Sequence, residues 1–478
     1  MYDFIVIGAG IVGTNIAREL SKYPFKTLVL EKENDVANHQ TVANSAIIHS
    51  GHDPIEGSLK AILCVKGNAL YEELEHELNI PLLRTGAFVL AHDKNEEKML
   101  EELKIRADHN GVPSSTILDG DTARKLEPNM SDSVTKVLSL PTTKVTYPWE
   151  VAFACLENAM KNGVEFQKNQ EVTNISWMND HFMVETNFKE TFETKHVISA
   201  SGIFSDQIAH MLEKDVPYTI NPRRGEYYVL DRRVKGYLER ILYPLPTEKG
   251  KGVLLVPQVH GNILVGPTSV EQLDRVRTNT TLDGMKQIKE DASRLAKNIP
   301  FEKTIRTFSG IRAGSTYKDF YIQESKEFKG FFHVAGIDSP GLTAAPAIAR
   351  YLVQEVIKPN VEKKVDFDPI REKKIFFYTL TEDEQKQKIK ENPLYGNIVC
   401  KCEKITEVEI LEAIHSPLGN DTIKGIKKRA RAGSGLCQGG YCENTVLKII
   451  ARETNQPLNK INYYGKDTPI LLKETKVK

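Results

Sequence analysis

The chain has 478 residues, with 64 Lys and Arg against 64 Asp and Glu, so its formal net charge is zero. This balance argues against a dedicated nucleic-acid-binding protein, which would carry a basic footprint. Charged residues make up 27% of the chain and no long low-complexity tract interrupts it. We therefore expect a globular protein, long enough for two or three domains with sizeable cores.

We expect neither a secretory signal nor a membrane span. A strand pattern begins almost at Met1, and no apolar run approaches the roughly 20 residues that a bilayer requires. The six cysteines fit a reducing compartment, since four gather near the C-terminus while Cys64 and Cys155 stand alone in apolar surroundings typical of buried thiols. These features predict a cytoplasmic protein that reaches a membrane only peripherally, through a partner.

The first 31 residues have the pattern strand, glycine turn, helix, strand. The apolar run 4–7 leads into Gly8-Ala9-Gly10-Ile11-Val12-Gly13, a G-x-G-x-x-G motif, and residues 14–23 have helical spacing before a second apolar run that ends at Glu31. The glycines let the backbone and a helix N-terminus approach a pyrophosphate, and the acid accepts from a ribose hydroxyl. The pattern predicts dinucleotide binding; a strand–helix turn without a ligand is the alternative.

Similar pieces recur far along the chain. Apolar runs end in small residues at 197–202 and 331–336, and residues 223–268 between them alternate like antiparallel strands. The predicted fold class is α/β, with a discontinuous Rossmann-type dinucleotide-binding domain, an inserted antiparallel substrate domain and a small C-terminal helical metal module. The expected dinucleotide-binding parts are about 1–80, 145–215 and 305–358, the substrate-domain parts about 81–144 and 216–304, the charged linker 359–395, the metal module 396–455 and the tail 456–478.

Four cysteines define the metal module. Cys400 and Cys402 form C-x-C, and Cys437 and Cys442 lie in a basic, glycine-rich stretch. Four thiolates can hold a [2Fe–2S] cluster or Zn²⁺. The glycines favour the cluster because its sulfurs accept hydrogen bonds from closely approaching backbone N–H groups, and the basic residues offset its negative charge. C-x-C is a poor zinc spacing, so the cluster is the prediction and zinc the alternative.

A [2Fe–2S] cluster moves one electron at a time, so another group must supply electrons. The large unit shows no second G-x-G-x-x-G after a strand, and it lacks the C-x-x-C of a disulfide reductase. One dinucleotide beside a one-electron centre indicates a flavin, because a flavin accepts a hydride and returns single electrons.

Four stretches resemble a known family, the FAD-dependent amine- and hydroxy-acid oxidoreductases that include D-amino-acid oxidase. Within this family the chain is most similar to type II glycerol-3-phosphate oxidases and dehydrogenases, and its end resembles the bacterioferritin-associated-ferredoxin-like [2Fe–2S] domain. The stretches are residues 43–51, 223–228, 265–268 and 339–348.

The resemblance implies an FAD-dependent dehydrogenase that oxidises sn-glycerol 3-phosphate to dihydroxyacetone phosphate by hydride transfer to flavin. Electrons would leave through the cluster to a partner subunit or a protein acceptor. L-2-hydroxyglutarate oxidoreductases share the R-G-E-Y-Y stretch at 224–228. The open alternatives are therefore dehydrogenation of L-2-hydroxyglutarate or another anionic hydroxy or amino acid, and a non-catalytic electron-transfer subunit.

The resemblance also assigns roles to single residues. His49 matches the histidine that faces the flavin as the base, a role that suits imidazole, with His52 as the fallback and a structural histidine as the alternative. Arg312, in an Arg-Ala rather than the family's usual Arg-Pro, is the expected clamp for a phosphate or carboxylate. Lys251 and Ser339 match substrate-side residues, with Lys249 competing for the first role.

The expected FAD-binding residues come from the fingerprint, from the 43–51 stretch and from the loop that opens the helix after residue 340. That helix N-terminus would stabilise an anionic reduced flavin. The full set is Gly8, Gly10, Ile11, Val12, Gly13, Glu31, Lys32, Asn44, Ser45, Val172, Ser201, Gly202, Gly310, Gly341, Leu342 and Thr343.

Overall fold

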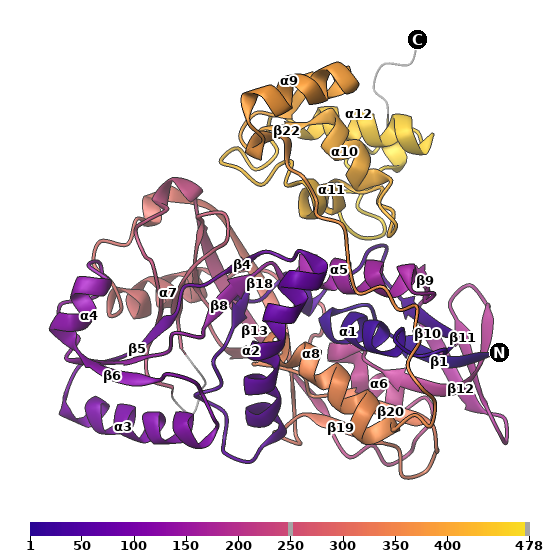
Figure 1. Cartoon of the computed structure of the whole chain (residues 1–478), viewed down its shortest axis with the longest axis horizontal. Helices are drawn as coiled ribbons and strands as arrows, with labels where there is room; N and C mark the ends of the chain where they lie inside the picture. Colours follow the sequence, from indigo (N-terminus) through magenta and orange to yellow (C-terminus); the bar gives the residue numbers. More distant parts are fainter. Residues whose placement is uncertain (247–251, 474–478) are drawn as a thin grey trace. The chain divides into compact units, whose positions relative to one another are not determined.

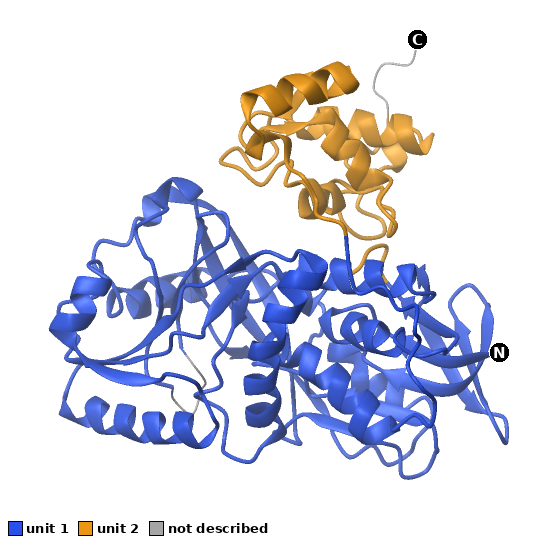
Figure 2. Cartoon of the chain, viewed as in Figure 1, with its two compact units in different colours: residues 1–32, 37–371 blue, residues 33–36, 372–478 orange. Residues whose placement is uncertain are grey.

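The structure is a computed structural model and describes residues 1–246 and 252–473. The chain folds into two compact units, the first made of residues 1–32 and 37–371 and the second of residues 33–36 and 372–478 (Figure 2). The division between them falls inside the expected linker, and a four-residue N-terminal segment belongs to the second unit.

Five parallel strands form the centre of the first sheet (Figure 1). Parallel strands covered on both faces consist of continuous apolar runs, and two of these five are buried at every position. An antiparallel hairpin continues from the start of one central strand, and another strand pairs at the edge. In order, the central strands are β20 (Phe331–Ala335), β12 (Thr191–Ser199), β1 (Tyr2–Ile7), β2 (Thr27–Glu31) and β9 (Glu165–Lys168); the others are β10 (Val172–Trp177), β11 (Phe182–Thr186) and β19 (Tyr321–Glu324).

Helices from distant parts of the sequence support this sheet. Helix α1 (Ile11–Leu20) is buried at all its positions, contacts β1 and β2, and packs against α5 (Pro148–Lys161) and α8 (Gly341–Tyr351). Helix α2 (Leu59–Leu78) packs on α8, and α6 (Ser205–Ala209) contacts β12 and β20. The strand–turn–helix–strand order at the N-terminus and the two later apolar strands are as predicted.

The second sheet has nine strands and is antiparallel except for one pair. Helices α3 (Lys94–His109), α4 (Gly120–Leu126) and α7 (Leu282–Ser293) contact it. A small third sheet joins β3 (Ile47–Ile48), β8 (Lys144–Thr146) and β4 (Leu82–Leu83). The nine strands are β17 (Val270–Glu271), β13 (Ile220–Leu230), β16 (Ile263–Gly266), β15 (Leu254–Pro257), β14 (Ile241–Tyr243), β5 (Ala87–Ala91), β7 (Lys136–Ser139) and β6 (Thr116–Asp119) in that order, with β18 (Thr304–Ser315) also paired to β13.

Two features of this sheet differ from the expected organisation. Strand β18 was expected among the dinucleotide-binding parts from residue 305, but it pairs with β13 along its whole length. The sheet is also not wholly antiparallel, since β14 pairs in parallel with β5 from the other substrate-domain segment. Both differences arise because long-range pairing, which local patterns do not encode, decides which sheet a strand joins.

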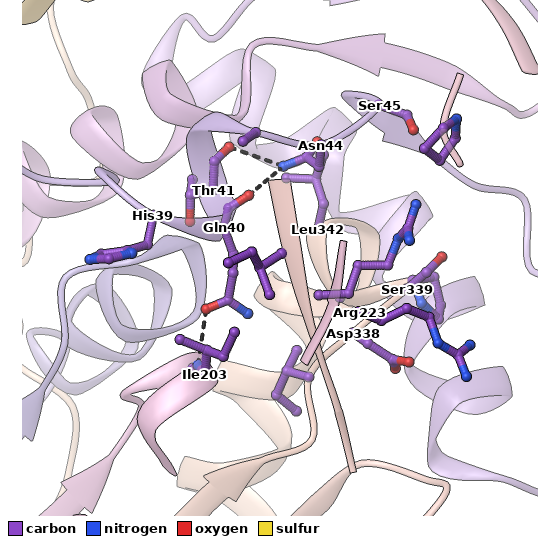
Figure 3. A pocket seen from close by; sticks show the side chains of 18 of the residues that line it. His39, Gln40, Thr41, Asn44, Ser45, Ile203, Arg223, Asp338, Ser339 and Leu342 are labelled. Atoms are coloured by element: carbon purple, nitrogen blue, oxygen red, sulfur yellow. Dashed lines mark hydrogen bonds between the residues drawn. The ribbon is translucent and has the colours of Figure 1, made fainter. Parts of the chain in front are cut away.

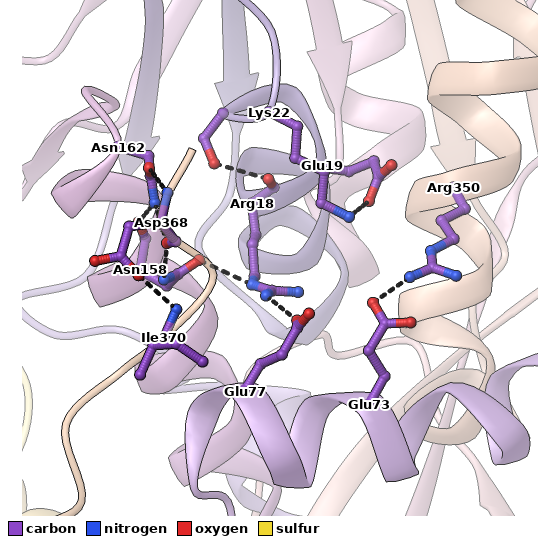
Figure 4. Close-up of polar contacts among 11 residues, drawn as sticks. Arg18, Glu19, Lys22, Glu73, Glu77, Asn158, Asn162, Arg350, Asp368 and Ile370 are labelled. Carbon is purple, nitrogen blue, oxygen red and sulfur yellow. Dashed lines mark hydrogen bonds and ion pairs between the residues drawn. The ribbon is translucent and has the colours of Figure 1, made fainter. Parts of the chain in front are cut away.

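The chain after α8 returns along the first unit (Figure 4). The carbonyl of Asp368 accepts hydrogen bonds from the side chains of Asn158 at 3.0 Å and Asn162 at 2.8 Å, both from the α5 region. Arg371 then forms ion pairs with Glu150 at 2.9 Å and Glu157 at 2.6 Å on α5. The first part of the expected linker is therefore held by specific polar contacts.

The second unit is mainly helical around one apolar core. The remainder of the expected linker contains α9 (Glu382–Glu391), which begins with a capping box between Thr381 and Glu384. The core lies among β21 (Ile398–Cys400), β22 (Ile405–Thr406), α10 (Glu407–Ile414), α11 (Ile423–Ala430) and α12 (Glu443–Thr454).

The N-terminal segment of this unit supplies a buried charge. Asp35 accepts from Arg429 through two bonds of 2.7 and 2.9 Å and pairs with Lys428 at 2.7 Å, and all three side chains are buried. Burial opposes the ionisation of Asp35, but the charges of Arg429 and Lys428 outweigh it and hold the pKa of this carboxyl well below its usual range.

Within residues 1–246 and 252–473, no helix combines the length and the apolar character that crossing a bilayer demands.

Candidate active site and cluster site

A cavity of about 810 Å³ lies within the first unit, between residues of both large sheets. This volume falls in the range of cofactor and small-molecule sites, about 300–1,000 Å³. Segments far apart in the sequence converge on it, as Figure 3 shows for residues from 39 to 342. The predicted residues that line it are Gly8, Gly10, Ile11, Val12, Glu31, Lys32, Asn44, Ser45, His49, Val172, Ser201, Gly202, Arg312, Ser339, Gly341 and Leu342.

Three predicted cofactor residues lie behind this lining instead. A Cβ on Gly13 would lie 1.9 Å from the Gly8 oxygen, and one on Gly310 would lie 1.9 Å from the oxygen of Ala43. Thr343 is fully buried, and its hydroxyl accepts from the backbone N–H of His49 at 2.9 Å. These residues allow close backbone packing around the cavity rather than forming its surface.

The fingerprint end of the cavity fits an anionic dinucleotide. Gly8 has φ +104°, a conformation that favours glycine, and a Cβ there would lie 2.7 Å from the oxygen of Ala200. Gly10 caps α1 without a side-chain bond of its own, and the first turn carries no acid, so the positive end of the helix dipole faces the cavity. Glu31 ends β2 and accepts from the backbone N–H of Ala9 at 2.8 Å.

A loop after β2 supplies lining residues that the sequence analysis did not select. Thr41 accepts from the backbone N–H of Ile11 at 2.9 Å, and the side chain of Gln40 accepts from Ile203 at 3.0 Å (Figure 3). The side-chain amide of Asn44 donates to the carbonyl of Gln40 at 3.2 Å and to that of Thr41 at 3.0 Å. These residues immediately precede the 43–51 stretch, and their position in the chain was the only available signal.

His49 follows β3 and is 9% exposed in the cavity wall. Its Nδ1 lies 3.1 Å from the hydroxyl of Tyr243, the last residue of β14. Complete burial, with smaller contributions from Cys64 and Asp53, raises the pKa of Tyr243 well above its usual range, so this phenol stays protonated. The hydrogen bond orients the imidazole ring, and Tyr243 is a residue that the sequence reasoning missed.

The remaining candidate residues are His52, the alternative base, and the two lysines considered for substrate binding. His52 does not line the cavity; it is 3% exposed, and its Nδ1 lies 3.1 Å from the hydroxyl of Ser50. Lys249 and Lys251 lie outside the described residues.

Arg312 extends over a glycine of the neighbouring strand. A Cβ on Gly225 would lie 2.5 Å from an Arg312 nitrogen, so the glycine makes room for the guanidinium. The guanidinium donates to the carbonyl of Thr268 at 3.3 and 3.4 Å, and within the described residues no carboxylate lies within 4.0 Å of it. A cation that has no counter-ion among the described residues, at a cavity wall, suits an anionic ligand.

The loop before α8 closes another side of the cavity. Ser339 lines it beside Asp338, which pairs with Lys60 at 2.7 Å. The N-terminus of α8 has no side-chain cap and no acidic residue in its first turn. Its free N–H groups can therefore stabilise negative charge that develops on a bound ring system.

The four C-terminal cysteines form two pairs in the second unit. The sulfurs of Cys402 and Cys437 lie 3.7 Å apart, and the thiol of Cys442 donates a hydrogen bond to the sulfur of Cys400. Two thiolates on one tetrahedral metal, with metal–sulfur bonds of about 2.3 Å, are separated by about 3.8 Å. Among the described residues, three or more His, Cys, Asp or Glu side chains do not gather closely enough to form a single-ion metal site.

Backbone donors and glycines surround these sulfurs. The bond from Cys442, then N–H groups of Gly433 and Glu403, lower the pKa of Cys400 to about 6 against the effect of burial. Burial likewise opposes ionisation of Cys437, but N–H groups of Tyr441 and Gly439 outweigh it and lower its pKa. A Cβ on Gly435 would lie 2.5 Å from that of Cys402, which explains the glycine there.

A Rossmann-type sheet joined to a mainly antiparallel second sheet, with the fingerprint at a cavity between them, defines a dinucleotide-dependent oxidoreductase. The family described as FAD dependent oxidoreductase matches residues 3–355, and the BFD-like [2Fe-2S] binding domain matches residues 398–452. The chain therefore belongs to the FAD-dependent oxidoreductase family and carries a [2Fe–2S] domain after its catalytic part. Its cofactors are FAD and a [2Fe–2S] cluster, and zinc is not supported.

Three relatives cover most of the chain. A glycerol 3-phosphate dehydrogenase of Caloramator mitchellensis is 42% identical over 478 residues, which is 100% of this chain and 99% of that protein. A glycerol 3-phosphate oxidase of Mycoplasma genitalium is 33% identical over 77% of this chain and 97% of its own length. The FAD-bound L-α-glycerophosphate oxidase of Mycoplasma pneumoniae has a TM-score of 0.75 and 28% identity, covering 78% of this chain and 99% of that one.

Proposed function

We propose that this protein oxidises sn-glycerol 3-phosphate to dihydroxyacetone phosphate, with the [2Fe–2S] cluster as the exit for electrons toward a partner protein. The observation that carries the proposal is one cavity that holds both His49 and Arg312, in a chain 42% identical along its whole length to a glycerol 3-phosphate dehydrogenase. When bound, FAD supplies the two-electron acceptor for the carbinol hydride.

His49 is the proposed base for the alcohol proton. Acceptance at Nε2 requires that Nδ1 carries the hydrogen and donates it to the Tyr243 oxygen, 3.1 Å away. The backbone of His49 is fixed from behind by Thr343, so the ring is held at one place in the cavity wall. Together these contacts orient the imidazole before substrate arrives.

Arg312 is the proposed anion clamp, and Ser339 adds a hydroxyl at the same cavity. The Arg312 guanidinium makes only long bonds to the Thr268 carbonyl, so it retains donors for a phosphate. Lys251 remains a proposed second cation, on grounds of the sequence alone. The substrate would thus be held at its charged end while its carbinol meets His49.

The exit for electrons is proposed on the asymmetry of the cysteine pairs. Cys400 and Cys442 are only 1% and 3% exposed, whereas Cys402 and Cys437 are partly exposed, beside the exposed Tyr441. A centre with one accessible edge suits transfer to a separate protein carrier. Four cysteines suited to a cluster and two isolated buried thiols, Cys64 and Cys155, fit a reducing compartment and lead us to place the protein in the cytoplasm, at a membrane only through such a partner.

Anaerobic mixing of the holoenzyme with glycerol 3-phosphate tests the substrate. We expect the flavin's visible absorbance to bleach, with L-2-hydroxyglutarate as the parallel arm. Bleaching by L-2-hydroxyglutarate alone would show that this acid, and not glycerol 3-phosphate, is the substrate. Bleaching by neither anion would favour a non-catalytic electron-transfer subunit.

The Cys437→Ser variant tests the exit. It should lose iron and keep FAD and flavin reduction, because the cysteines belong to the second unit, but it should reduce an added one-electron protein acceptor far more slowly. Equal, rapid hydrogen peroxide formation in air by the variant and the wild type would show an oxidase in which the cluster is off the electron path.

A further inference from the structure

The register of the second sheet places two arginines opposite each other. Strands β13 and β18 are antiparallel, and Arg223 pairs directly with Arg312. Side chains of directly opposed residues lie on the same face with Cβ atoms about 4.5–5.5 Å apart. Both side chains line the cavity, and Figure 3 shows Arg223 together with Asp338 and Ser339 at one end of it.

This arrangement costs stability, because like charges directly opposite on a sheet repel each other. The next pair along the same face is Gly225 opposite Gly310, followed by Tyr227 opposite Phe308 with rings stacked at 4.6 Å. Arg312 and Pro267 fill the space over Gly225, and Ala43 fills the space over Gly310, so neither position has room for a side chain of its own. A repulsive cationic pair at a cavity wall is what an anion-binding site needs and what a purely structural sheet avoids.

The neighbouring arginine of the same motif shows how an arginine with a purely structural role is placed in this sheet. Arg224 points to the opposite face, where it pairs with the fully buried Glu226 at 3.3 Å and bonds to Asn279 at 3.1 Å. Glu226 in turn accepts from Thr281, which caps α7. Arg224 is thus neutralised within the fold and stays out of the cavity.

Arg223 has only a weak internal counter-ion. Its described ionic partner is Glu271 at 3.2 Å, and the side chains are 42% and 82% exposed, so water screens the pair strongly. A ligand that brings two negative charges to the cavity end can draw both Arg223 and Arg312 toward it. A ligand with one charge is satisfied by Arg312 alone.

We propose that Arg223 is a specificity-determining residue that, with Arg312, selects a substrate whose charged end is a dianion on one centre, a phosphomonoester, over one that ends in a carboxylate. The inference deepens the proposed function and rests on it. A phosphomonoester offers three oxygens and a charge close to −2 at neutral pH, which matches two guanidiniums, whereas a carboxylate offers two oxygens and one charge. L-2-hydroxyglutarate also carries two charges, but they lie on separate carboxylates.

Calorimetric titration of the FAD-loaded holoenzyme with inorganic phosphate tests the inference, with acetate as the monoanionic probe. We expect Arg223→Gln to weaken phosphate binding about tenfold while acetate binding changes less than about threefold, since a half-exposed charge-assisted contact falls at the weak end of such bonds. Arg223→Lys should restore most of the preference for phosphate. Glu271→Gln should tighten phosphate binding, because it releases Arg223.

A pH series adds a measurement that a merely structural role would not change. Wild-type affinity for phosphate should rise with pH as the ligand gains its second charge, and this rise should flatten in Arg223→Gln. Arg233→Gln is the matched control, because Arg233 also pairs with a carboxylate, that of Asp231 at 2.8 Å, but lies away from the cavity. It should bind phosphate as the wild type does.

The outcomes separate this inference from the proposed function. Unchanged phosphate affinity and pH dependence in Arg223→Gln, with FAD content and thermal unfolding as in the wild type, would overturn the role of Arg223 even if glycerol 3-phosphate reduces the flavin. Lost phosphate preference in Arg223→Gln, in an enzyme that glycerol 3-phosphate does not reduce, would support Arg223 and overturn the proposed substrate.

Discussion

At the scale of single residues, three hydrogen bonds fix the position of His49. Its backbone donates to Thr343, its ring meets Tyr243, and its carbonyl accepts from Asn68 at 3.0 Å. A base that must meet a proton at one point gains from such rigidity, because misplacement by about 1 Å can cost two orders of magnitude in rate.

His49→Asn should slow flavin reduction by glycerol 3-phosphate about 10²- to 10⁴-fold with substrate binding largely kept, the range expected when a general base is removed. In the wild type the rate should rise with pH through one ionisation, because only neutral imidazole accepts the proton. Stopped-flow reduction across a pH series measures both effects. A variant that keeps the wild-type rate and profile would assign the proton to a water or to His52.

Tyr243→Phe isolates the orienting bond from the base itself. The ring stays apolar and of nearly the same size, so packing survives, but His49 Nδ1 loses its partner. We expect kcat to fall about tenfold with little change in KM and a displaced pH profile, since one buried hydrogen bond contributes about 1 kcal/mol or slightly more. An unchanged pH profile would show that Tyr243 only fills space.

At the scale of elements, β18 joins the proposed cofactor site to the proposed substrate site. Gly310 packs against the carbonyl of Ala43 in the loop that carries Asn44 and Ser45, and Arg312 stands two residues further on the same face. A shift of this strand would therefore disturb both sites at once.

Two glycines of β18 allow a matched comparison. In Gly310→Ala the new Cβ would lie 1.9 Å from the Ala43 oxygen, so we expect about 1–3 kcal/mol of destabilisation, weaker FAD retention and a raised KM. In Gly314→Ala the nearest atoms lie 3.5 Å away or more, so stability and kinetics should stay near wild type. Urea unfolding and FAD content compare the two; equal effects would show that β18 tolerates displacement.

The sequence predicted elements where a local pattern sufficed. The fingerprint, the strands at 197–202 and 331–336 and the helix after residue 340 carry apolar spacing and small residues that the structure places as expected. Strand β18 was assigned to the other sheet because its pairing with β13 is a long-range property. Arg223 and Tyr243 were missed as site residues for the same reason: each gains its role from a partner more than 80 residues away in the chain.

At the scale of the whole molecule, the second unit depends on charge balance. Lys428, Arg429 and Asp35 are buried together, and removing the only acid of the trio would break two buried ion pairs. Breaking a buried ion pair in this way typically costs about 3–5 kcal/mol.

Asp35→Asn should therefore lower the urea concentration at which the cluster's visible absorbance is lost, while FAD release from the first unit changes little. The folded-state pKa of Asp35 is depressed, so its contribution is complete above the unfolded pKa of about 3.9 and is lost only as pH falls toward the folded value. The difference between variant and wild type should thus stay constant from about pH 5 to pH 8. A difference that varies across this window would point to another titrating group.

Residues 33–36 have one more consequence, which concerns how this protein can be divided. A gene fragment that starts at residue 372 would encode all four cysteines but not Asp35, and its product would bury Lys428 and Arg429 without their counter-ion. The C-terminal residues alone therefore do not make up the complete iron–sulfur unit, although all four cysteines lie at that end of the sequence. Four residues near the N-terminus are part of its fold, so no single cut in the chain separates the two units.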